Sequence, residues 1–423
     1  ACAGANNQGQ LGNGDPTHAT QTSPVNVQIG EWHFVGGAPF GYWQNTEMAF
    51  TAGGAVDVGS SHACAIRNTF SWSTNTTQRE VVCWGRGGSG QLGDGAAANR
   101  TSPVVVGSVS EPVVAVAVGG EHSCALTSGG RVWCWGKNDE GQLGIGSTIN
   151  QNTPQLLTSL TEVVQVVAGA SHTCALLANG RARCWGWNNQ GELGLGHANR
   201  ETAPQEVLNS VGGSNVPMQN VTSLTAGYHH TCAVFADGTA RCWGDGEFAQ
   251  NGSPTNKDIL VANGNLALRT GFRTVRLSAG REQTCALSDL GSVACWGNNT
   301  GNRLGVGDAS TIYSPTLVGG MTGAVSLQGG GCTLCAVRSD GSAQCWGDNT
   351  SGTVGNGVFG GTVSTPTTVS SLSEVVSVTS DCQVSCAMLA NGSVRCWGLD
   401  DVGQLGNGDP TQNSATPVTV SSF

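Results

Sequence analysis

Charged residues are scarce in this chain of 423 residues, at 11% against roughly a quarter in typical soluble proteins. Acidic side chains outnumber basic ones by 28 to 18, for a net charge of −10, so no basic surface is expected that would attract nucleic acid or an anionic membrane. The apolar runs, such as Val113–Val118, are far shorter than the roughly 20 residues that cross a bilayer. These absences predict no nucleic-acid partner and no membrane span.

The chain also lacks an initiator methionine and a signal-peptide pattern, since it opens Ala-Cys-Ala-Gly. This opening indicates that a leader was removed or that the sequence begins inside a longer precursor. Glycine, by contrast, is abundant at 65 residues, about twice its ordinary share. The glycines show no G-X-Y period, and Val, Leu and Trp recur throughout, so collagen and disorder are excluded and a sizeable core is expected.

A self-similar unit fills most of the chain. It reads V-x-V-x-x-G-x-x-H-x-C-A-L, a turn, V-x-C-W-G-x-N-x-x-G-Q-L-G-x-G, and then S/T-P-x-x-V. Each unit contains four short apolar or alternating stretches bounded by turn residues, which predicts four antiparallel strands and almost no helix. Its second cysteine recurs at intervals of 51, 50, 58, 53, 50 and 51 residues, at Cys83, Cys134, Cys184, Cys242, Cys295, Cys345 and Cys396.

A four-stranded repeat of about 50 residues is a propeller blade, so the fold class is all-β, a seven-bladed β-propeller with an extra N-terminal half-repeat. We expect a half-repeat over residues 1–30, which holds the outer two strands of a blade and is a candidate for strand donation. An aromatic-rich insertion is expected over 31–54 and the propeller over 55–423. The expected blades cover about 55–108, 109–158, 159–210, 211–264, 265–319, 320–370 and 371–423.

These motifs closely resemble the regulator of chromosome condensation repeat family over nearly the whole chain. The best matches are His122-Ser123-Cys124-Ala125-Leu126, Cys134-Trp135-Gly136-Lys137-Asn138 and Gly141-Gln142-Leu143-Gly144. The resemblance implies a seven-bladed propeller. The fourth unit departs most, because Ala249-Gln250-Asn251-Gly252 replaces the G-Q-L-G loop.

The repeated cysteines are predicted to form one cross-strand disulfide per blade. In six units two cysteines lie ten residues apart around a turn such as Ala178-Asn179-Gly180. A three-residue hairpin loop with a left-handed Gly places residues 177 and 181 opposite each other, so Cys174 faces Cys184 within bonding reach. The predicted pairs are Cys64 with Cys83 around a longer hairpin, Cys124 with Cys134, Cys174 with Cys184, Cys232 with Cys242, Cys285 with Cys295, Cys335 with Cys345, and Cys386 with Cys396.

Three further cysteines lie outside this pattern. Cys332 and Cys382 occupy the same inter-strand loop of adjacent units, which predicts a bridge between blades. Cys2 matches the C-W-G cysteine of a repeat whose partner half is missing, and is a candidate for an intermolecular bond. For the seven repeat pairs, the alternatives to disulfides are reduced core thiols and zinc sites. The zinc alternative is disfavoured because no C-x2-C partner lies near any pair. Repeated disulfides indicate an oxidising compartment, so we expect an extracellular or cell-surface protein.

Four histidines precede a repeat cysteine by two positions and are either a ring of metal ligands or structural hydrogen-bonding groups. The later units carry Gln283, Thr333 and Val384 there, which favours the structural role. The C-W-G tryptophans are expected to fill the wedges between blades rather than to stack on sugars; a glycan ligand is possible but unsupported. The histidines are His62, His122, His172 and His230.

No catalytic, cofactor or metal site is predicted. The G-x-L-G-x-G loops precede no helix pattern and no Lys-Ser/Thr, so turn geometry explains them better than phosphate binding. No carboxylate pair or nucleophile signature recurs. N-x-S/T sequons occur by chance or as glycosylation sites, at Asn75, Asn99, Asn220, Asn251, Asn298, Asn349 and Asn391.

Two unrepeated segments are the better pointers to function. They either present exposed aromatic anchors of the kind that dominate interfaces, or cover the propeller's edge or plug its channel. The candidate interface residues are Trp32, Phe34, Phe40, Tyr42, Trp43 and Phe50 in the insertion, and Phe70 and Trp72 in the first blade's long hairpin.

The leading functional hypothesis is an extracellular, non-catalytic binding or assembly module whose partners are other proteins or copies of itself. The unpaired edges of the half-repeat could add strands and form an oligomer or filament. The alternatives are a secreted protein inhibitor, a ligand-binding propeller, the guanine-nucleotide-exchange and chromatin-binding activity that the resemblance implies, and a secreted hydrolase or lyase. The acidic balance and oxidised cysteines argue against the exchange activity.

Overall fold

The computed structural model describes residues 2–4, 21–25, 56–71, 76–253, 255, 257–262, 264–266, 268–307, 311–410, 412–421 and 423. The chain divides into two compact units, Ala1–Thr46 and Glu47–Phe423. In the first unit, β1 (Cys2–Gly4) pairs antiparallel with β2 (Gln21–Val25). The boundaries expected at residues 30 and 54 lie outside the described residues.

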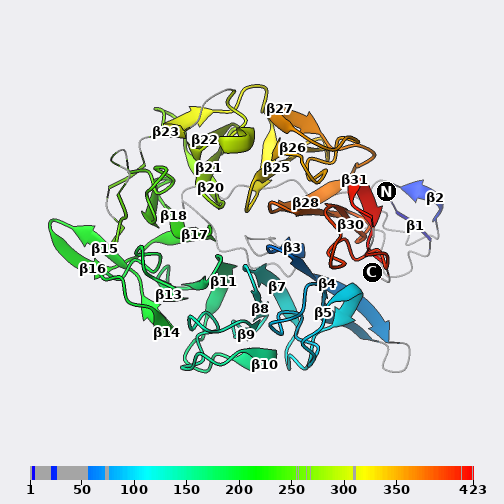
Figure 1. The fold of residues 1–423 in the computed structure, drawn as a ribbon, viewed down its shortest axis with the longest axis horizontal. Coiled ribbons are helices and arrows are strands. Elements are labelled where there is room, and N and C mark those ends of the chain that lie inside the picture. The colour runs from blue at the N-terminus through cyan, green and yellow to red at the C-terminus, as the bar shows by residue number, and fades with distance from the viewer. Residues whose placement is uncertain are drawn as a thin grey trace. The chain divides into compact units, whose positions relative to one another are not determined.

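The second unit is the predicted seven-bladed propeller, with its sheets arranged around a central axis (Figure 1). Blade 1 consists of β3 (Val56–Val58), β4 (His62–Ser71), β5 (Thr76–Gly85) and β6 (Arg100–Val105). Blade 2 consists of β7 (Val113–Val118), β8 (His122–Thr127), β9 (Val132–Gly136) and β10 (Gln151–Leu156). Blade 3 consists of β11 (Val163–Ala168), β12 (His172–Leu177), β13 (Ala182–Gly186) and β14 (Glu201–Glu206).

The last three blades repeat this meander of four consecutive antiparallel strands. Blade 5 consists of β20 (Thr274–Ala279), β21 (Gln283–Ser288), β22 (Val293–Asn298) and β23 (Thr311–Leu317). Blade 6 consists of β24 (Ala324–Gln328), β25 (Thr333–Arg338), β26 (Ala343–Asp348) and β27 (Thr362–Thr368). Blade 7 consists of β28 (Val375–Ser380), β29 (Val384–Leu389), β30 (Val394–Gly398) and β31 (Ser414–Thr419).

Blade 4 differs from the predicted four strands. Among the described residues, its sheet contains only β17 (Val221–Ala226), β18 (His230–Phe235) and β19 (Ala240–Gly244), and a bridge from Gly244 to Ile259 lies where the other blades have an outer strand. An additional hairpin, β15 (Leu208–Val211) with β16 (Ser214–Pro217), precedes it. The sequence explains the difference, because this unit lacks both the G-Q-L-G loop and the regular spacing of its outer strand.

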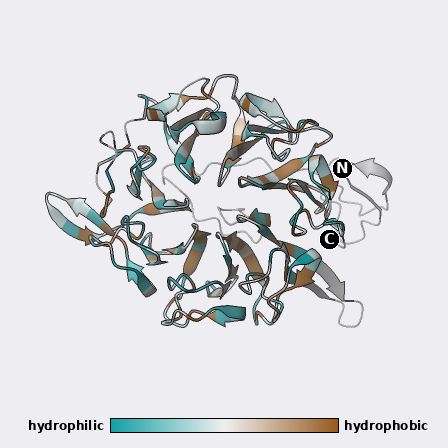
Figure 2. Ribbon diagram, viewed as in Figure 1, coloured by the Kyte–Doolittle hydropathy of each residue, from teal (hydrophilic) through white to brown (hydrophobic). Residues whose placement is uncertain are grey.

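The core lies between neighbouring blades and in their inner strands. Hydrophobic residues concentrate there, whereas outer strands such as β10 and β14 are more hydrophilic (Figure 2). The ring closes by side-to-side packing of blade 7 on blade 1, where Trp84 and Val56 share a buried cluster with Val394 and Leu405. The only described helical element is η1 (Thr300–Asn302), a 3₁₀ turn, and no described helix could span a membrane.

Candidate functional site

Seven disulfides link the second and third strands of the seven blades. In blade 3, Cys174 lies directly opposite Cys184, and Gly180 adopts the left-handed conformation with φ 75° that the three-residue turn requires. The structure joins Cys64 to Cys83, Cys124 to Cys134, Cys174 to Cys184, Cys232 to Cys242, Cys285 to Cys295, Cys335 to Cys345 and Cys386 to Cys396. All fourteen residues are buried.

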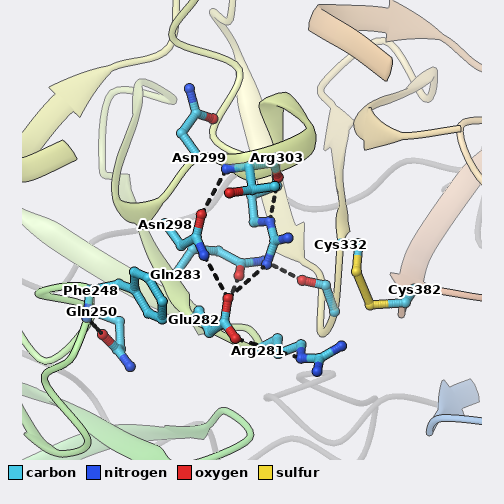
Figure 3. Close-up of polar contacts among 12 residues, drawn as sticks. Phe248, Gln250, Arg281, Glu282, Gln283, Asn298, Asn299, Arg303, Cys332 and Cys382 are labelled. Atoms are coloured by element: carbon cyan, nitrogen blue, oxygen red, sulfur yellow. Dashed lines mark hydrogen bonds and ion pairs between the residues drawn. A yellow bond between two sulfur atoms is a disulfide. The ribbon is translucent and has the colours of Figure 1, made fainter. Parts of the chain in front are cut away.

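An eighth disulfide, Cys332–Cys382, joins the turns that precede β25 and β29, and so links blades 6 and 7 (Figure 3). Its Cα atoms lie 4.4 Å apart. Both cysteines are partly exposed, unlike the fourteen intrablade cysteines. This bridge is therefore the accessible one among the disulfides of the described residues.

The four repeat histidines hydrogen-bond between blades. His122 Nε2 lies 2.9 Å from Thr173 Oγ1 of the next blade, and Thr173 Oγ1 donates its only proton to the Gln142 carbonyl. The histidine must therefore be the donor, which fixes the Nε2–H tautomer. The equivalent pairs are His62 with Ser123, His172 with Thr231 and His230 with Thr284.

Burial keeps these imidazoles neutral. Desolvation lowers the pKa of His62, His172 and His230 to about 3 and that of His122 to about 4. A Cβ atom on Gly169 would lie 2.3 Å from His172 Cε1, so the repeat glycine is needed for the ring to pack there. The four histidines lie on separate blades and serve as structural hydrogen-bond donors.

The exceptions to the histidine pattern are coupled between blades. Blade 5 carries Gln283 at the histidine position. Blade 6 carries Leu334 at the position where the serine or threonine hydroxyl would accept the hydrogen bond of such a histidine. Gln283 Nε2 donates to the Gly331 carbonyl at 2.7 Å. The sixth unit's Thr333 bonds within its own blade, to the Asp348 carbonyl.

The C-W-G tryptophans fill the interfaces between blades. All seven are fully buried. Trp185 Nε1 donates to the Gln142 carbonyl of the preceding blade at 2.9 Å, and Trp84 donates to the Gln404 carbonyl across the closure of the ring. They are core residues, which leaves no face for stacking on a sugar.

A polar cluster that the repeat does not predict lies in the central channel, a cavity of about 100 Å³ lined by the innermost strands of all seven blades. Asp57 accepts hydrogen bonds from Thr379 Oγ1 at 3.1 Å and Gln328 Nε2 at 3.2 Å, and from the backbone N–H of Val118 at 2.8 Å. Burial raises the pKa of Asp57 to about 6. This carboxyl connects blades 1, 2, 6 and 7. Its sequence signal is an Asp where other units carry Ala, Val, Thr, Ser or Gln.

One mouth of the channel is crossed by Tyr228. Its hydroxyl lies 2.8 Å from Ser60 Oγ of blade 1 and hydrogen-bonds to Asp381 of blade 7. The Arg281 guanidinium of blade 5 lies 5.5 Å from the centre of the tyrosine ring, within the range of a cation–π interaction. Side chains from four blades thus narrow this mouth.

Next to this mouth, Glu282 is the centre of a charged cluster (Figure 3). It accepts a hydrogen bond from Asn298 Nδ2 at 2.7 Å and forms ion pairs with Arg303 at 3.4 Å and Arg281 at 3.8 Å. Arg303 Nε also donates to the Thr300 carbonyl. The two arginines and one glutamate leave the cluster with one excess positive charge, and the cluster ties η1 to the first turn of blade 5.

The opposite mouth is rimmed by valines. Because the inner strands of blades 2 to 7 start on the face that carries the turns between second and third strands, their second residues lie at that rim. Val164, Val275, Val325 and Val376 are 45%, 45%, 57% and 44% exposed. A polar residue would suffice for folding at such positions, as Thr222 shows in blade 4. We call these four residues the valine rim.

The long hairpin β4–β5 rises on the same face and has a groove on each side. The groove toward blade 2 has a volume of about 1090 Å³, and the groove toward blade 7 about 540 Å³; Asn68 and Arg79 line both. Arg67 forms an ion pair with Glu80 across the hairpin at 3.0 Å. Sequence reasoning identified the hairpin but missed the grooves and the valine rim.

Most aromatic candidates lie outside the described residues, namely Trp32, Phe34, Phe40, Tyr42, Trp43, Phe50 and Trp72. Phe70 belongs to β4 and pairs with Thr77, and Cys2 pairs with Val25; only their backbones are described. In the described part of the chain, no three His, Cys, Asp or Glu side chains converge to hold a metal ion.

The sequons divide by accessibility. Asn251, Asn298 and Asn349 are buried, and each donates its amide nitrogen to another group of the chain. Glycosylation at those amides is incompatible with the folded structure. The exposed sequon asparagines are Asn99, Asn220 and Asn391; Asn75 lies outside the described residues.

Comparison with known proteins identifies similar sequences and folds. A sequence model of the RCC1-like domain matches residues 80–423. The chain is 30% identical to the ultraviolet-B receptor UVR8 of Arabidopsis thaliana over 269 residues, 62% of this chain and 57% of UVR8. It is 29% identical to the E3 ubiquitin-protein ligase HERC2 of Homo sapiens over 270 residues, 64% of this chain and 5% of HERC2. The matches thus span less than two thirds of these relatives.

Among solved structures, Prp20p from Saccharomyces cerevisiae has a similar fold, with a TM-score of 0.71 and 23% identity. The alignment covers 81% of this chain and 86% of Prp20p, a protein described with its binding properties toward Gsp1p and histones.

Proposed function

Because the chain belongs to the RCC1-like domain family, we propose that it is a non-catalytic ring that binds another protein outside the reducing cytosol. The exposed valine rim carries the proposal. Four large apolar side chains stand 44–57% exposed around one channel mouth, and apolar groups held in water on one face are typical of an interaction surface.

The grooves beside β4–β5 extend this surface. They combine apolar walls, such as Val105 and Met388, with the charged groups of Arg79, Glu80 and Glu111. An apolar centre with a polar rim is the usual anatomy of a protein interface. The partner we propose is therefore a protein with an apolar protrusion for the rim and polar groups for the grooves.

Site-specific photocrosslinking in the native extracellular fraction tests the surface. A crosslinker at Val325 should capture a discrete partner protein, and Val164→Thr, Val275→Thr and Val376→Thr together should abolish the capture without changing the unfolding midpoint. The matched control places the crosslinker at Ile149, which is 69% exposed on a loop between third and fourth strands. Equal capture from both positions, or none from Val325, would overturn the proposal.

The eight disulfides support the compartment, because structural bridges persist in oxidising environments and are rare in the cytosol. Non-reducing mass spectrometry of natively isolated protein should find these sixteen cysteines bonded. Free repeat thiols in freshly isolated material would contradict an extracellular role.

Self-assembly through the N-terminal half-repeat is a second candidate function. The register Cys2↔Val25 and Gly4↔Gln21 resembles that of the outer strands of blade 3, where Cys184 faces Gln205. Each outer strand of the six four-stranded blades carries a proline, at Pro103, Pro154, Pro204, Pro315, Pro366 and Pro417, and β2 carries Pro24. Proline blocks strand addition at an edge, so the other edge of β1 is the one that could accept a strand.

Electron microscopy of concentrated native protein tests this assembly. Oligomers or filaments are expected, and removal of residues 1–25 should abolish them while the propeller stays folded. Isolated rings at every concentration would contradict the assembly but would not contradict protein binding at the valine rim.

A further inference from the structure

Four blades share a buried asparagine, two residues after the C-W-G motif, that organises the loop before the outer strand. Its Oδ1 accepts the N–H of the residue five positions later, as Asn138 does from Leu143 at 2.9 Å. Its Nδ2 donates to carbonyl oxygens of the same loop, those of Ser147 and Ile149 in blade 2. The other members are Asn188, Asn299 and Asn349, and all four are 0–2% exposed.

Blade 7 carries Asp400 at this position. Its Oδ1 accepts the N–H of Leu405 at 2.9 Å, as the asparagines do. Its Oδ2, which replaces the amide nitrogen, is buried and has no hydrogen-bond partner, and the residue is 1% exposed. Leaving a buried carboxylate oxygen unpaired is costly, so the site lacks a positively charged or proton-donating group.

The loop of blade 7 is one residue longer than that of blade 2 but keeps two of its backbone contacts. The Asp400 N–H donates to Asn413 Oδ1 at 2.9 Å, and the Asn138 N–H donates to Asn150 Oδ1 at 2.8 Å. Gly408 N donates to a carbonyl of the neighbouring outer strand, as does Gly146 N. In blade 2 the corresponding atom, Asn138 Nδ2, donates to two carbonyl oxygens, whereas Asp400 Oδ2 has no hydrogen-bond partner.

The surrounding charges are negative. Burial raises the pKa of Asp400 to about 6, and the carboxylates of Asp409 and Asp401 act in the same direction. Residues 399–413 contain no lysine or arginine. At neutral pH the carboxyl is largely ionised and faces no cation of the loop.

We propose that residues 400–410 of this loop bind one metal cation, with calcium preferred, through Asp400 Oδ2 and backbone carbonyl oxygens. Calcium takes carboxylate, carbonyl and water oxygens in flexible geometry, whereas magnesium demands a near-ideal octahedron. No three acidic, histidine or cysteine side chains converge among the described residues, so carbonyls and water complete the shell. A single carboxylate places the affinity in the weak range of extracellular calcium modules, with Kd on the order of 10⁻⁴–10⁻³ M.

Thermal unfolding of the full chain at pH 7.5, with and without calcium chloride, tests the site. Calcium at roughly ten times that Kd should raise the unfolding midpoint of the wild type but not of Asp400→Asn. That variant restores the amide that four blades carry and should fold. Anomalous diffraction from calcium-soaked crystals should place an ion beside Asp400.

A gain-of-site variant supplies the converse experiment. Asn138→Asp should create a second calcium-dependent rise in the unfolding midpoint at the equivalent loop of blade 2. An equal calcium response in wild type and Asp400→Asn would overturn the proposal. The proposal would also be overturned if calcium left the unfolding midpoint of the wild type unchanged and Asp400→Asn had the higher midpoint. Asp400 would then be a destabilising unpaired group and not a cation ligand.

Discussion

His122 Nε2 lies 2.9 Å from Thr173 Oγ1 of the neighbouring blade, and the same threonine donates to the Gln142 carbonyl that Trp185 Nε1 also reaches. One hydroxyl and one carbonyl thus join a histidine, a threonine and a tryptophan. All of these side chains are fully buried. The repeat motif H-[S/T]-C and C-W-G is therefore a single interlocking unit shared by two blades.

Removing the hydroxyl should destabilise this interface. Thr173→Val leaves the buried His122 N–H without an acceptor, and an unsatisfied buried donor costs about 1–3 kcal/mol. Denaturant unfolding should show a loss of that size in the free energy of unfolding. Thr173→Ser retains the hydroxyl and should lose much less; equal losses in the two variants would refute the hydrogen-bond role.

Stability should fall on acidification between about pH 6.5 and pH 4. The folded-state pKa values of His62, His122, His172 and His230 lie near 3–4, so the unfolded chain binds up to four more protons once the pH drops below 6.5. Asp57 and Asp400, with pKa raised to about 6, oppose this, because the folded chain binds their protons first between pH 6 and 3.8. Burial also raises the pKa of Asp245 and Asp381, which act in the same direction. The net excess of at most about two protons predicts a slope of up to roughly 3 kcal/mol per pH unit near pH 5.

Chemical unfolding at a series of pH values measures this slope. Asp400→Asn removes one opposing group and should steepen it by about 1.4 kcal/mol per pH unit. Stability that rises as the pH falls from 6.5 to 4 would show that the four imidazoles are not held neutral in the fold.

The interblade disulfide should be the first to be reduced in the native protein. Cys332 and Cys382 are partly exposed, whereas the intrablade cysteines are buried, and thiol exchange requires access to a sulfur atom. Graded dithiothreitol, alkylation and peptide mapping should find Cys332 and Cys382 labelled before the others. In urea the preference should vanish; intrablade labelling first under native conditions would count against the prediction.

The repeat made the propeller and the disulfide register predictable, because hairpin geometry places residues ten apart in facing positions, as for Cys174 and Cys184. Contacts between blades were harder to predict from the sequence. Asp57 and Tyr228 are single departures from the repeat, and their partners Thr379 and Ser60 lie more than 150 positions away in the chain. The valine rim follows the repeat pattern, but its exposure depends on the closure of the ring.

Tyr228→Phe should loosen the mouth of the channel. The phenol is held neutral, since burial raises its pKa to about 12, and it serves Ser60 of blade 1 and Asp381 of blade 7 at once. Losing the hydroxyl leaves the buried Asp381 with one partner fewer, at an expected cost of about 1–3 kcal/mol. Tyr313→Phe is the matched control. Because Tyr313 is 50% exposed, this variant should have the same free energy of unfolding as the wild type. If both variants match the wild type in denaturant, the tyrosine does not brace the ring, and the narrowing of the channel mouth has no role in stability.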